Sequence, residues 1–275
     1  MYPLETLPYS LRYRLMELAS PAERYRLQLF KGMDIPKPLA ITIRKMETVC
    51  FHYDDCLKRY SFENNEVMYC DGNLRLINVF NLTSEYFEAL SKHLVLMPNS
   101  IDIDYSSNSS AFYETLSEMT MASTTRIRIG SGTHMPSYKV LFKAFPKVTR
   151  LVFPVSTPTK YVTEILKYQK CKLSYLALLY CYYIPLELFT SDEIYAFMKA
   201  QSHDFQLRLC MFHPSDEFIS AFRAVVNLNK TNVFYLPLDE KRFRDRQSLK
   251  RHSPSQDLEM DFTILPEAKR RKSNE

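Results

Sequence analysis

The feature that most constrains the fold is a short strand-like pattern that returns about every 25 residues. Seven segments alternate apolar and polar residues, as a strand with one buried face does. They are LRLINVF from Leu74, IDIDY from Ile101, RIRIG from Arg126, RLVFP from Arg150, SYLALL from Ser174, FQLRL from Phe205 and NVFYL from Asn232. One apolar position in each marks the repeat: Leu76, Ile101, Ile127, Leu151, Leu176, Leu207 and Val233. The successive steps are 25, 26, 24, 25, 31 and 26 residues, which indicates a repeat architecture.

Between these segments the apolar residues change to a helical period. The stretches are LTSEYFEALSKHL from Leu82, SAFYETLSEM from Ser110, SYKVLFKAF from Ser137, TKYVTEILKY from Thr159, SDEIYAFMKA from Ser191 and SDEFISAFRAVV from Ser215. The first places Tyr86, Phe87, Leu90 and Leu94 on one helical face. Most have a hydroxyl residue able to cap the helix, and these are Ser84, Ser110, Ser137, Thr159, Ser191 and Ser215. Alternating strands and helices predict right-handed crossovers, with a parallel sheet inside a curve and helices outside.

The predicted fold class is therefore α/β, with a curved, mostly parallel strand–helix repeat over residues 74–240. This pattern resembles a divergent leucine-rich-repeat (LRR) solenoid in its period and element order. The alternative is a doubly wound nucleotide-binding sheet, which needs a glycine-rich phosphate turn. The only candidate turn, GSGT at Gly130, lacks the third glycine and the lysine.

Residues 1–33 have a different pattern, which predicts two short helices. Leu7 and Pro8 precede a first helix that carries leucines on one face. These are Leu11, Leu15 and Leu18. The second helix begins at Ser20-Pro21 with Glu23 three residues after the serine, which is the pattern of a capping box with proline at the first helical position. A helix pair this small cannot bury all its apolar residues alone, so some face the rest of the chain or a partner.

This N-terminal stretch resembles the F-box: Leu-Pro, a leucine-bearing helix, a Ser-Pro break and then ERYRLQL. An F-box followed by an LRR-like domain is a common architecture that is heavily expanded in nematodes. The resemblance implies a non-enzymatic substrate receptor that tethers an unknown target protein to a cullin-type ubiquitin ligase. It also implies contacts with the ligase adaptor, through Leu7, Pro8, Leu11, Leu15 and Leu18. The alternative is a solenoid scaffold with no ligase link, whose N-terminal helices only cap the open end of the repeat.

Two further regions complete the predicted organisation. Residues 34–73 contain ITIRKMETVCFHYDD and RYSFENNEVMYC, which predict short strands with a turn at Asn64-Asn65, and we interpret them as a β linker region. Residues 241–275 are polar, charged and without period, which predicts a disordered basic tail. Its KRFRDRQSLKR and KRRK runs resemble nuclear import signals, with solubilising charge as the alternative. The rest of the chain is close to neutral, which makes nucleic acid an unlikely partner of the body.

No motif is specific enough to support catalysis, so we expect no enzyme, no cofactor and no metal. Cysteine, histidine and aspartate lie close together in one stretch, at Cys50, His52, Asp54, Asp55 and Cys56. Cys70 follows 14 residues later with no partner histidine nearby, so a half-buried strand explains the cluster better than a metal site.

Two groups of residues leave alternatives open. Asp102 and Asp104 share one face of a strand, either as paired carboxylates of an enzyme or as charges that face solvent or a partner. A tyrosine-rich stretch is either core or a set of anchors on a concave binding face. Its tyrosines are Tyr175, Tyr180, Tyr182 and Tyr183.

The start of the chain lacks a secretory apolar core, and no stretch of about 18 apolar residues could cross a membrane. We expect an intracellular protein in the cytoplasm. Nuclear import through the basic tail stays an open alternative. The six cysteines are then reduced thiols.

Overall fold

The computed structural model divides the chain into two compact units, Met1–Pro237 and Leu238–Glu275. It describes residues 7–31, 39–52, 62–63, 65–82, 88, 91–130, 133, 136–154, 161–181, 191–211 and 232–237. All of them belong to the first unit. The second unit, and with it the predicted disordered tail 241–275, lies outside the described residues.

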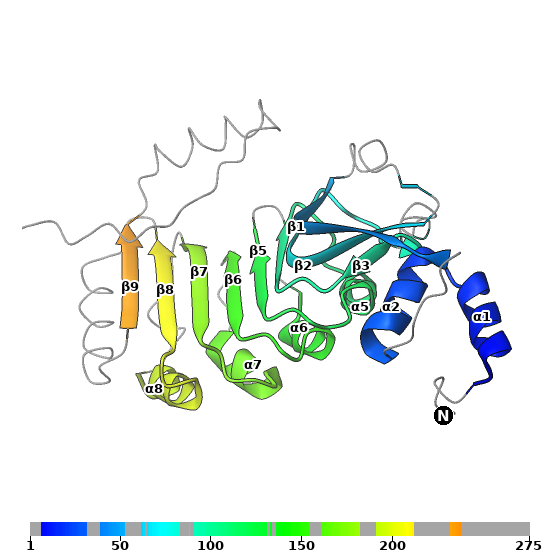
Figure 1. Cartoon of the computed structure of the whole chain (residues 1–275). Coiled ribbons are helices and arrows are strands. Elements are labelled where there is room, and N and C mark those ends of the chain that lie inside the picture. The colour runs from blue at the N-terminus through cyan, green and yellow to red at the C-terminus, as the bar shows by residue number, and fades with distance from the viewer. Residues whose placement is uncertain are drawn as a thin grey trace, which may run out of the picture. The chain divides into compact units, whose positions relative to one another are not determined.

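The described part of the chain is a mixed α/β fold built on one sheet (Figure 1). The strands are β1 (Thr42–His52), β2 (Glu66–Ile77), β3 (Leu94–Leu96), β4 (Ser100–Asp104), β5 (Arg126–Ile129), β6 (Arg150–Pro154), β7 (Tyr175–Cys181), β8 (Gln206–Met211) and β9 (Asn232–Pro237). Their order in the sheet follows their order in the chain, with β3 paired beside β2, and each pairing of described strands is parallel. A doubly wound sheet instead reverses its strand order at a switch point. The described strand order therefore does not fit the nucleotide-binding alternative.

The register of the strands follows the sequence repeat. Most of the marked apolar positions lie opposite one another in one continuous row: Ile101, Ile127, Leu151, Leu176, Leu207 and Val233. The first marked position was assigned wrongly, because Ile101 lies opposite Leu74 and Leu76 lies opposite Ile103. A difference of two residues keeps both side chains on the same face, so the predicted buried face is correct.

Residues 34–73, which were expected to form short linker strands, contribute long strands to the same sheet. β1 has 11 residues and β2 has 12, and Val49 of β1 lies opposite Leu74, which extends the apolar row by one strand. The register shifts between Met46 and Thr48. At this bulge a Cβ on Gly72 would lie 2.1 Å from the carbonyl oxygen of Glu47, so the close approach of the two backbones requires glycine.

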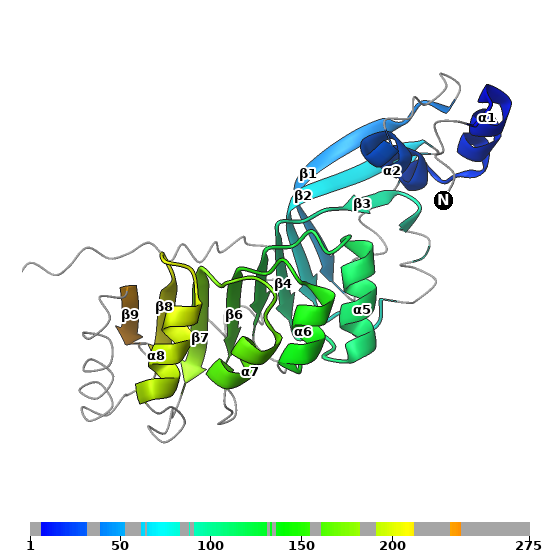
Figure 2. The same ribbon diagram turned by 90° about the horizontal axis from the view of Figure 1, so that it is seen from below.

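Helices cover one face of the sheet. They are α5 (Ser110–Met119), α6 (Tyr138–Ala144), α7 (Tyr161–Tyr168) and α8 (Ser191–Ala200), and Figure 2 shows them side by side along the strands. All four match predicted helical stretches. The predicted helical stretch from Leu82 is wrong at Leu94, which lies in β3. Its other predicted face residues, Tyr86, Phe87 and Leu90, lie outside the described residues. The sixth stretch, from Ser215, lies outside the described residues.

The predicted caps are correct at one helix and wrong by one residue at another. The hydroxyl of Ser137 accepts a hydrogen bond from the Val140 N–H at the start of α6, as expected. At α5 the cap is Ser109 and not Ser110, and it accepts from the Phe112 N–H. Ser191 is the first residue of α8, and Ser84, Thr159 and Ser215 lie outside the described residues.

The core lies between the sheet and these helices. The inward side chains of these strands are at most 7% exposed: Val49, Phe51, Leu74, Leu76, Ile101, Ile103, Ile127, Ile129, Leu151, Phe153, Leu176, Leu178 and Leu207. They pack against the apolar faces of the helices, including the rings of Tyr138 and Tyr161 on either side of Phe153. One apolar cluster therefore joins the described strands from β1 to β8 and their helices into a single core.

The N-terminal helices are α1 (Tyr9–Leu18) and α2 (Pro21–Lys31). α2 packs on β2 and β3 through a second apolar cluster of Ala22, Tyr25, Val67 and Val95. Because residues alternate along β2, this cluster lies on the side of the strand opposite to Met68 and the main core. α2 therefore covers one end of the sheet face that α5 to α8 leave open.

Candidate protein-binding surfaces

An open groove between α1 and α2 is the first candidate site. Its volume is about 430 Å³. Its lining is mostly apolar, with one charged pair: Leu15, Leu18, Ala19, Glu23, Arg26 and Leu27. An apolar groove with a few charged groups at its rim suits an apolar protein segment.

The residues predicted to contact an adaptor lie on or beside this groove. Leu15 and Leu18 line it, and Leu18 is 71% exposed while Leu15 is half-buried. Leu11 lies one turn earlier on α1 and is 54% exposed. Leu7 is half-buried, and Pro8 is exposed at the start of α1, where its carbonyl oxygen accepts from the Leu11 and Arg12 N–H groups. The five residues thus follow one short segment, and two of them form a wall of the groove.

Sequence reasoning did not identify the opposite wall of the groove. Glu23, Arg26 and Leu27 come from α2, and three- and four-residue spacing places them on one helical face. That spacing was visible in the sequence. Which face of α2 turns towards α1 depends on how α2 packs on the sheet, and no local pattern shows this.

The break between the two helices is the predicted capping box. The Ser20 N–H donates to the Glu23 carboxylate at 2.8 Å, and the Glu23 N–H donates to the Ser20 hydroxyl at 3.3 Å. The Ser20 hydroxyl also donates to the carboxylate at 2.8 Å. The bond from the Ser20 backbone, followed by that from its hydroxyl, lowers the pKa of Glu23 below its ordinary value. These bonds fix the start of α2 directly after the end of α1.

Two arginines attach α2 to the sheet region. Arg24 donates to the Leu39 carbonyl oxygen at 2.8 Å and to the Asn65 side-chain oxygen at 3.1 Å. Arg26 donates to the Leu94 carbonyl oxygen at 3.0 Å, and burial lowers its pKa. These bonds hold the α2 wall of the groove in place before any partner binds, which reduces the entropy cost of binding.

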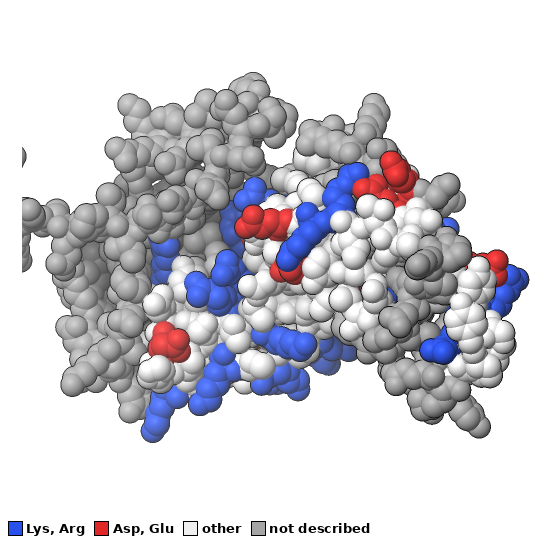
Figure 3. All heavy atoms as spheres, viewed as in Figure 1, with Lys and Arg blue, Asp and Glu red and all other residues white. Residues whose placement is uncertain are grey.

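The second candidate site is the sheet face opposite to the main core, which we call the polar face. In the described residues from Leu74 to Arg208 its charged members come from β2, β4, β5, β6 and β8, and they are Arg75, Asp102, Asp104, Arg126, Arg128, Arg150 and Arg208. Figure 3 shows basic side chains gathered over the middle of the molecule with acidic ones among them. The charges follow from the alternation of the strands, because every second residue points away from the core.

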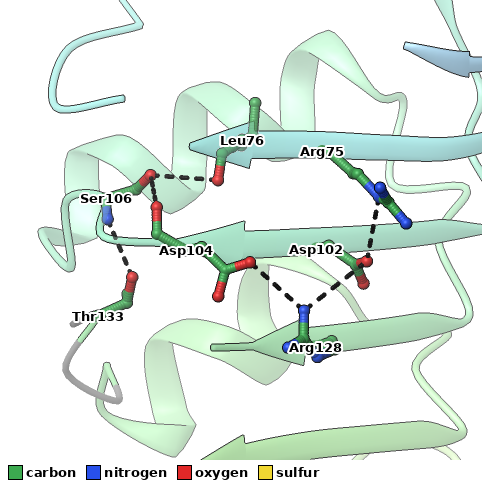
Figure 4. A network of polar contacts seen from close by, with 7 residues as sticks. All are labelled: Arg75, Leu76, Asp102, Asp104, Ser106, Arg128 and Thr133. Carbon is green, nitrogen blue, oxygen red and sulfur yellow. Dashed lines mark hydrogen bonds and ion pairs between the residues drawn. The ribbon is translucent and has the colours of Figure 1, made fainter. Parts of the chain in front are cut away.

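Ion pairs join the acidic residues of the polar face to two arginines (Figure 4). Asp102 lies 3.7 Å from Arg75 and 4.0 Å from Arg128, and Arg128 lies 3.4 Å from Asp104. Burial raises the pKa of Asp102, although Arg128 and Arg75 act in the opposite direction. The shared arginine favours charges that face the solvent or a partner over a pair of catalytic carboxylates.

The carboxylate of Asp104 lies in the space that the missing side chain of Gly130 leaves, and a network of hydrogen bonds lies beside it. A Cβ on Gly130 would lie 1.6 Å from the Asp104 carboxylate oxygen, so the carboxylate occupies the place of a side chain. The Ser106 hydroxyl donates to the Asp104 carbonyl oxygen at 2.8 Å, and the Ser106 N–H donates to the Thr133 hydroxyl at 2.9 Å (Figure 4). These contacts tie the end of β4 to the segment after β5.

The tyrosine-rich stretch contributes to the polar face through Tyr175. This half-buried ring lies 4.7 Å from the guanidinium carbon of Arg150, a cation–π contact. Tyr175 therefore lies on the polar face and not in the main core. The side chain of Tyr180 and the residues Tyr182 and Tyr183 lie outside the described residues.

The cysteine-rich stretch brings no metal ligands together in the described residues. Cys50 is exposed on β1, whereas Cys70 is fully buried in the core. Within the described ranges, no three His, Cys, Asp or Glu side chains are placed to hold a metal ion. Asp54, Asp55 and Cys56 lie outside those ranges.

Comparison of the chain with protein-family models, with curated proteins and with solved structures gives no match. Among the described helices, none has the length and apolar character needed to cross a membrane.

Proposed function

We propose that this chain is a non-enzymatic protein-binding module, an F-box-like substrate receptor of the type expanded in nematodes. In this proposal residues 1–33 bind the adaptor of a cullin-type ubiquitin ligase through the α1–α2 groove. Residues 74–240 form an LRR-like repeat that binds the target protein on its polar face. The protein then acts inside the cell and needs no cofactor.

One observation carries the proposal: two leucines of α1, Leu11 and Leu18, are left out of the core. Leu11 and Leu18 are more than half exposed, and they lie beside a groove lined by Leu15 and Leu27. Exposed apolar groups that gather at a groove mark interaction sites, since exposing them to water costs free energy. Interface energy usually sits in a few such anchors.

The order of the sheet supports an LRR-like repeat. Successive strands are neighbours in the sheet, and the described connecting helices share one face. Stacked repeats of this kind leave the other face open as an extended binding surface. The polar face, with Arg150 on Tyr175, has the residue types that are enriched at interfaces.

The second candidate function is a scaffold with no ligase link. The packing of Ala22 and Tyr25 on Val67 and Val95 favours it, because a repeat needs a cap at its open end. In this alternative α2 caps the sheet and α1 has no binding role.

Capture of the full chain by purified, immobilised adaptor at about 1 μM distinguishes the two functions. We expect the wild type to be retained and Leu18→Asp to be lost, because a buried charge at the centre of an apolar interface is costly. The matched control is Leu29→Asp. Leu29 is also an exposed leucine, on α2, but it lies two residues from Leu27 and thus away from the groove.

The control variant should bind like the wild type. Failure of the wild type to bind at this concentration would exclude the ligase link and leave the scaffold function. Equal losses in Leu18→Asp and Leu29→Asp would exclude the groove as the docking site.

A further inference from the structure

We propose that the polar face binds an extended acidic segment of the target protein, through the carboxylates of its Asp and Glu residues. This inference rests on the proposed function, in which the polar face binds the target. It adds the chemistry of the partner and the residues that recognise it.

The polar face has more positive than negative charge. In the described residues from Leu74 to Arg208 it carries five arginines against Asp102 and Asp104. Both aspartates are in ion pairs with Arg75 and Arg128. The positive excess therefore includes Arg126 and Arg150, and it is complementary to an acidic partner.

Arg126 and Arg150 form the centre of this excess. They lie directly opposite each other on β5 and β6, and Arg126 is exposed. In the described part of the chain, neither has an ion pair with a carboxylate. Neighbouring parallel strands are about 4.8 Å apart, so the two like charges repel each other. A carboxylate bound between them would relieve this repulsion.

The ring of Tyr175 holds Arg150 ready for such a ligand. The guanidinium lies over the ring at 4.7 Å, and its Nε is buried without a hydrogen-bond partner in the described residues. A guanidinium stacked on a ring keeps its N–H donors in one plane, and this fork fits a carboxylate with two parallel hydrogen bonds. An arginine already held in place also loses less entropy on binding.

An extended acidic peptide fits this site better than a nucleic acid. The chain before the basic tail is close to neutral, so it has no general positive field for a phosphate backbone. Arg126 and Arg150 instead lie on neighbouring strands about 4.8 Å apart, so one carboxylate can reach both guanidinium groups. In an extended segment with alternating acidic residues every second side chain is about 6.8 Å from the next, so one carboxylate can bind this pair while others face the rest of the polar face.

The test measures binding of a fluorescein-labelled octapeptide of alternating Glu and Ser to the full chain, by fluorescence anisotropy at about 50 mM salt. We expect this peptide to bind and its Glu→Gln version not to bind. Arg126→Gln with Arg150→Gln should weaken binding by about tenfold or more, because charge-assisted hydrogen bonds are lost. Tyr175→Phe should bind like the wild type, whereas Tyr175→Leu should bind more weakly because the ring that holds Arg150 is removed.

The matched control is Lys139→Gln with Lys147→Gln, two exposed cations at α6 and just after it, which changes the net charge equally. This control should leave peptide binding unchanged. Equal binding of the Gln peptide, equal loss in the lysine control, or binding only of a phosphoserine version would overturn the inference.

Adaptor capture by the wild-type chain, measured beside its binding of the Glu peptide, separates this inference from the proposed function. Normal adaptor capture by a wild-type chain that does not bind the Glu peptide would refute only the acidic partner. Glu-peptide binding by a chain that captures no adaptor would refute only the ligase link.

Discussion

Leucines in the sheet and leucines in α1 have opposite environments in the same molecule. Leu151 and Leu176 are 0% and 1% exposed and belong to the continuous row of the core. Leu11 and Leu18 are 54% and 71% exposed, although their helix has the same apolar spacing as a packed one. Burial of the core leucines removes apolar surface from water and stabilises the fold. The exposed leucines of α1 gain this free energy only when a partner covers them. The comparison teaches that apolar spacing predicts a face, but not what covers it.

The largest expected effect lies in the core row. Phe153→Ala should lower the free energy of unfolding by about 3–5 kcal/mol, because it leaves a cavity between two tyrosine rings. Those rings lie 5.9 Å (Tyr138) and 5.7 Å (Tyr161) from the Phe153 ring. Urea unfolding of the full chain measures this change. A loss below about 1 kcal/mol would show that the sheet core is not packed as described.

A smaller effect is expected on the polar face. Gly130→Ala should lower the free energy of unfolding by about 2 kcal/mol, because the new Cβ displaces the Asp104 carboxylate from its place beside Arg128. The clash distance is 1.6 Å. In the Asp104→Ala background the same substitution should cost much less, and a double-mutant cycle by urea unfolding measures that coupling. Equal losses of stability in both backgrounds would show that the new Cβ does not act through the Asp104 carboxylate.

A substitution at the break between α1 and α2 should have a smaller effect on stability still. Ser20→Ala removes the hydroxyl of the capping box and should lower the free energy of unfolding by about 1 kcal/mol. Ser20→Thr, which keeps the hydroxyl, should restore most of this free energy. Urea unfolding of the two variants checks the prediction, and an equal loss in both would mean that the hydroxyl bond does not contribute to stability.

The capping box at this break also predicts that the free energy of unfolding depends slightly on pH. Because the folded state lowers the pKa of Glu23 below its ordinary value of 4.5, its contribution to stability is complete above that value. The contribution is lost as the pH falls through the lowered pKa. Between about pH 6 and about pH 3, Glu23→Gln should therefore lose less stability than the wild type. Urea unfolding at both pH values measures the difference, and identical losses would contradict the assignment.

The regular part of the fold could be predicted because one period controls it. The strand segments from Leu74 to Asn232 and the helices α5 to α8 follow from alternation and helical spacing, and even the pair Arg126–Arg150 follows from the 24-residue step. The lengths of β1 and β2 could not be predicted, since the bulge at Gly72 interrupts the alternation. Leu94 was placed on a helix because a short apolar run fits either period.

The candidate sites were predictable only in part. The leucine face of α1 follows from its spacing, and the capping box follows from Ser20 and Glu23. The groove also needs Arg26 and Leu27, whose orientation is set by the packing of Ala22 and Tyr25 on the sheet. Contacts between segments far apart in the chain have no local signal.

The most direct test of the central claim is the free energy of unfolding of Leu11→Ala with Leu18→Ala, measured by urea beside adaptor capture by the same protein. If these leucines belong to an interface, the free energy of unfolding should change by no more than about 0.5 kcal/mol, while capture is lost. If they instead stabilise the fold, the loss should be about 2–5 kcal/mol for each leucine. That result would contradict the assignment of α1 as a docking helix.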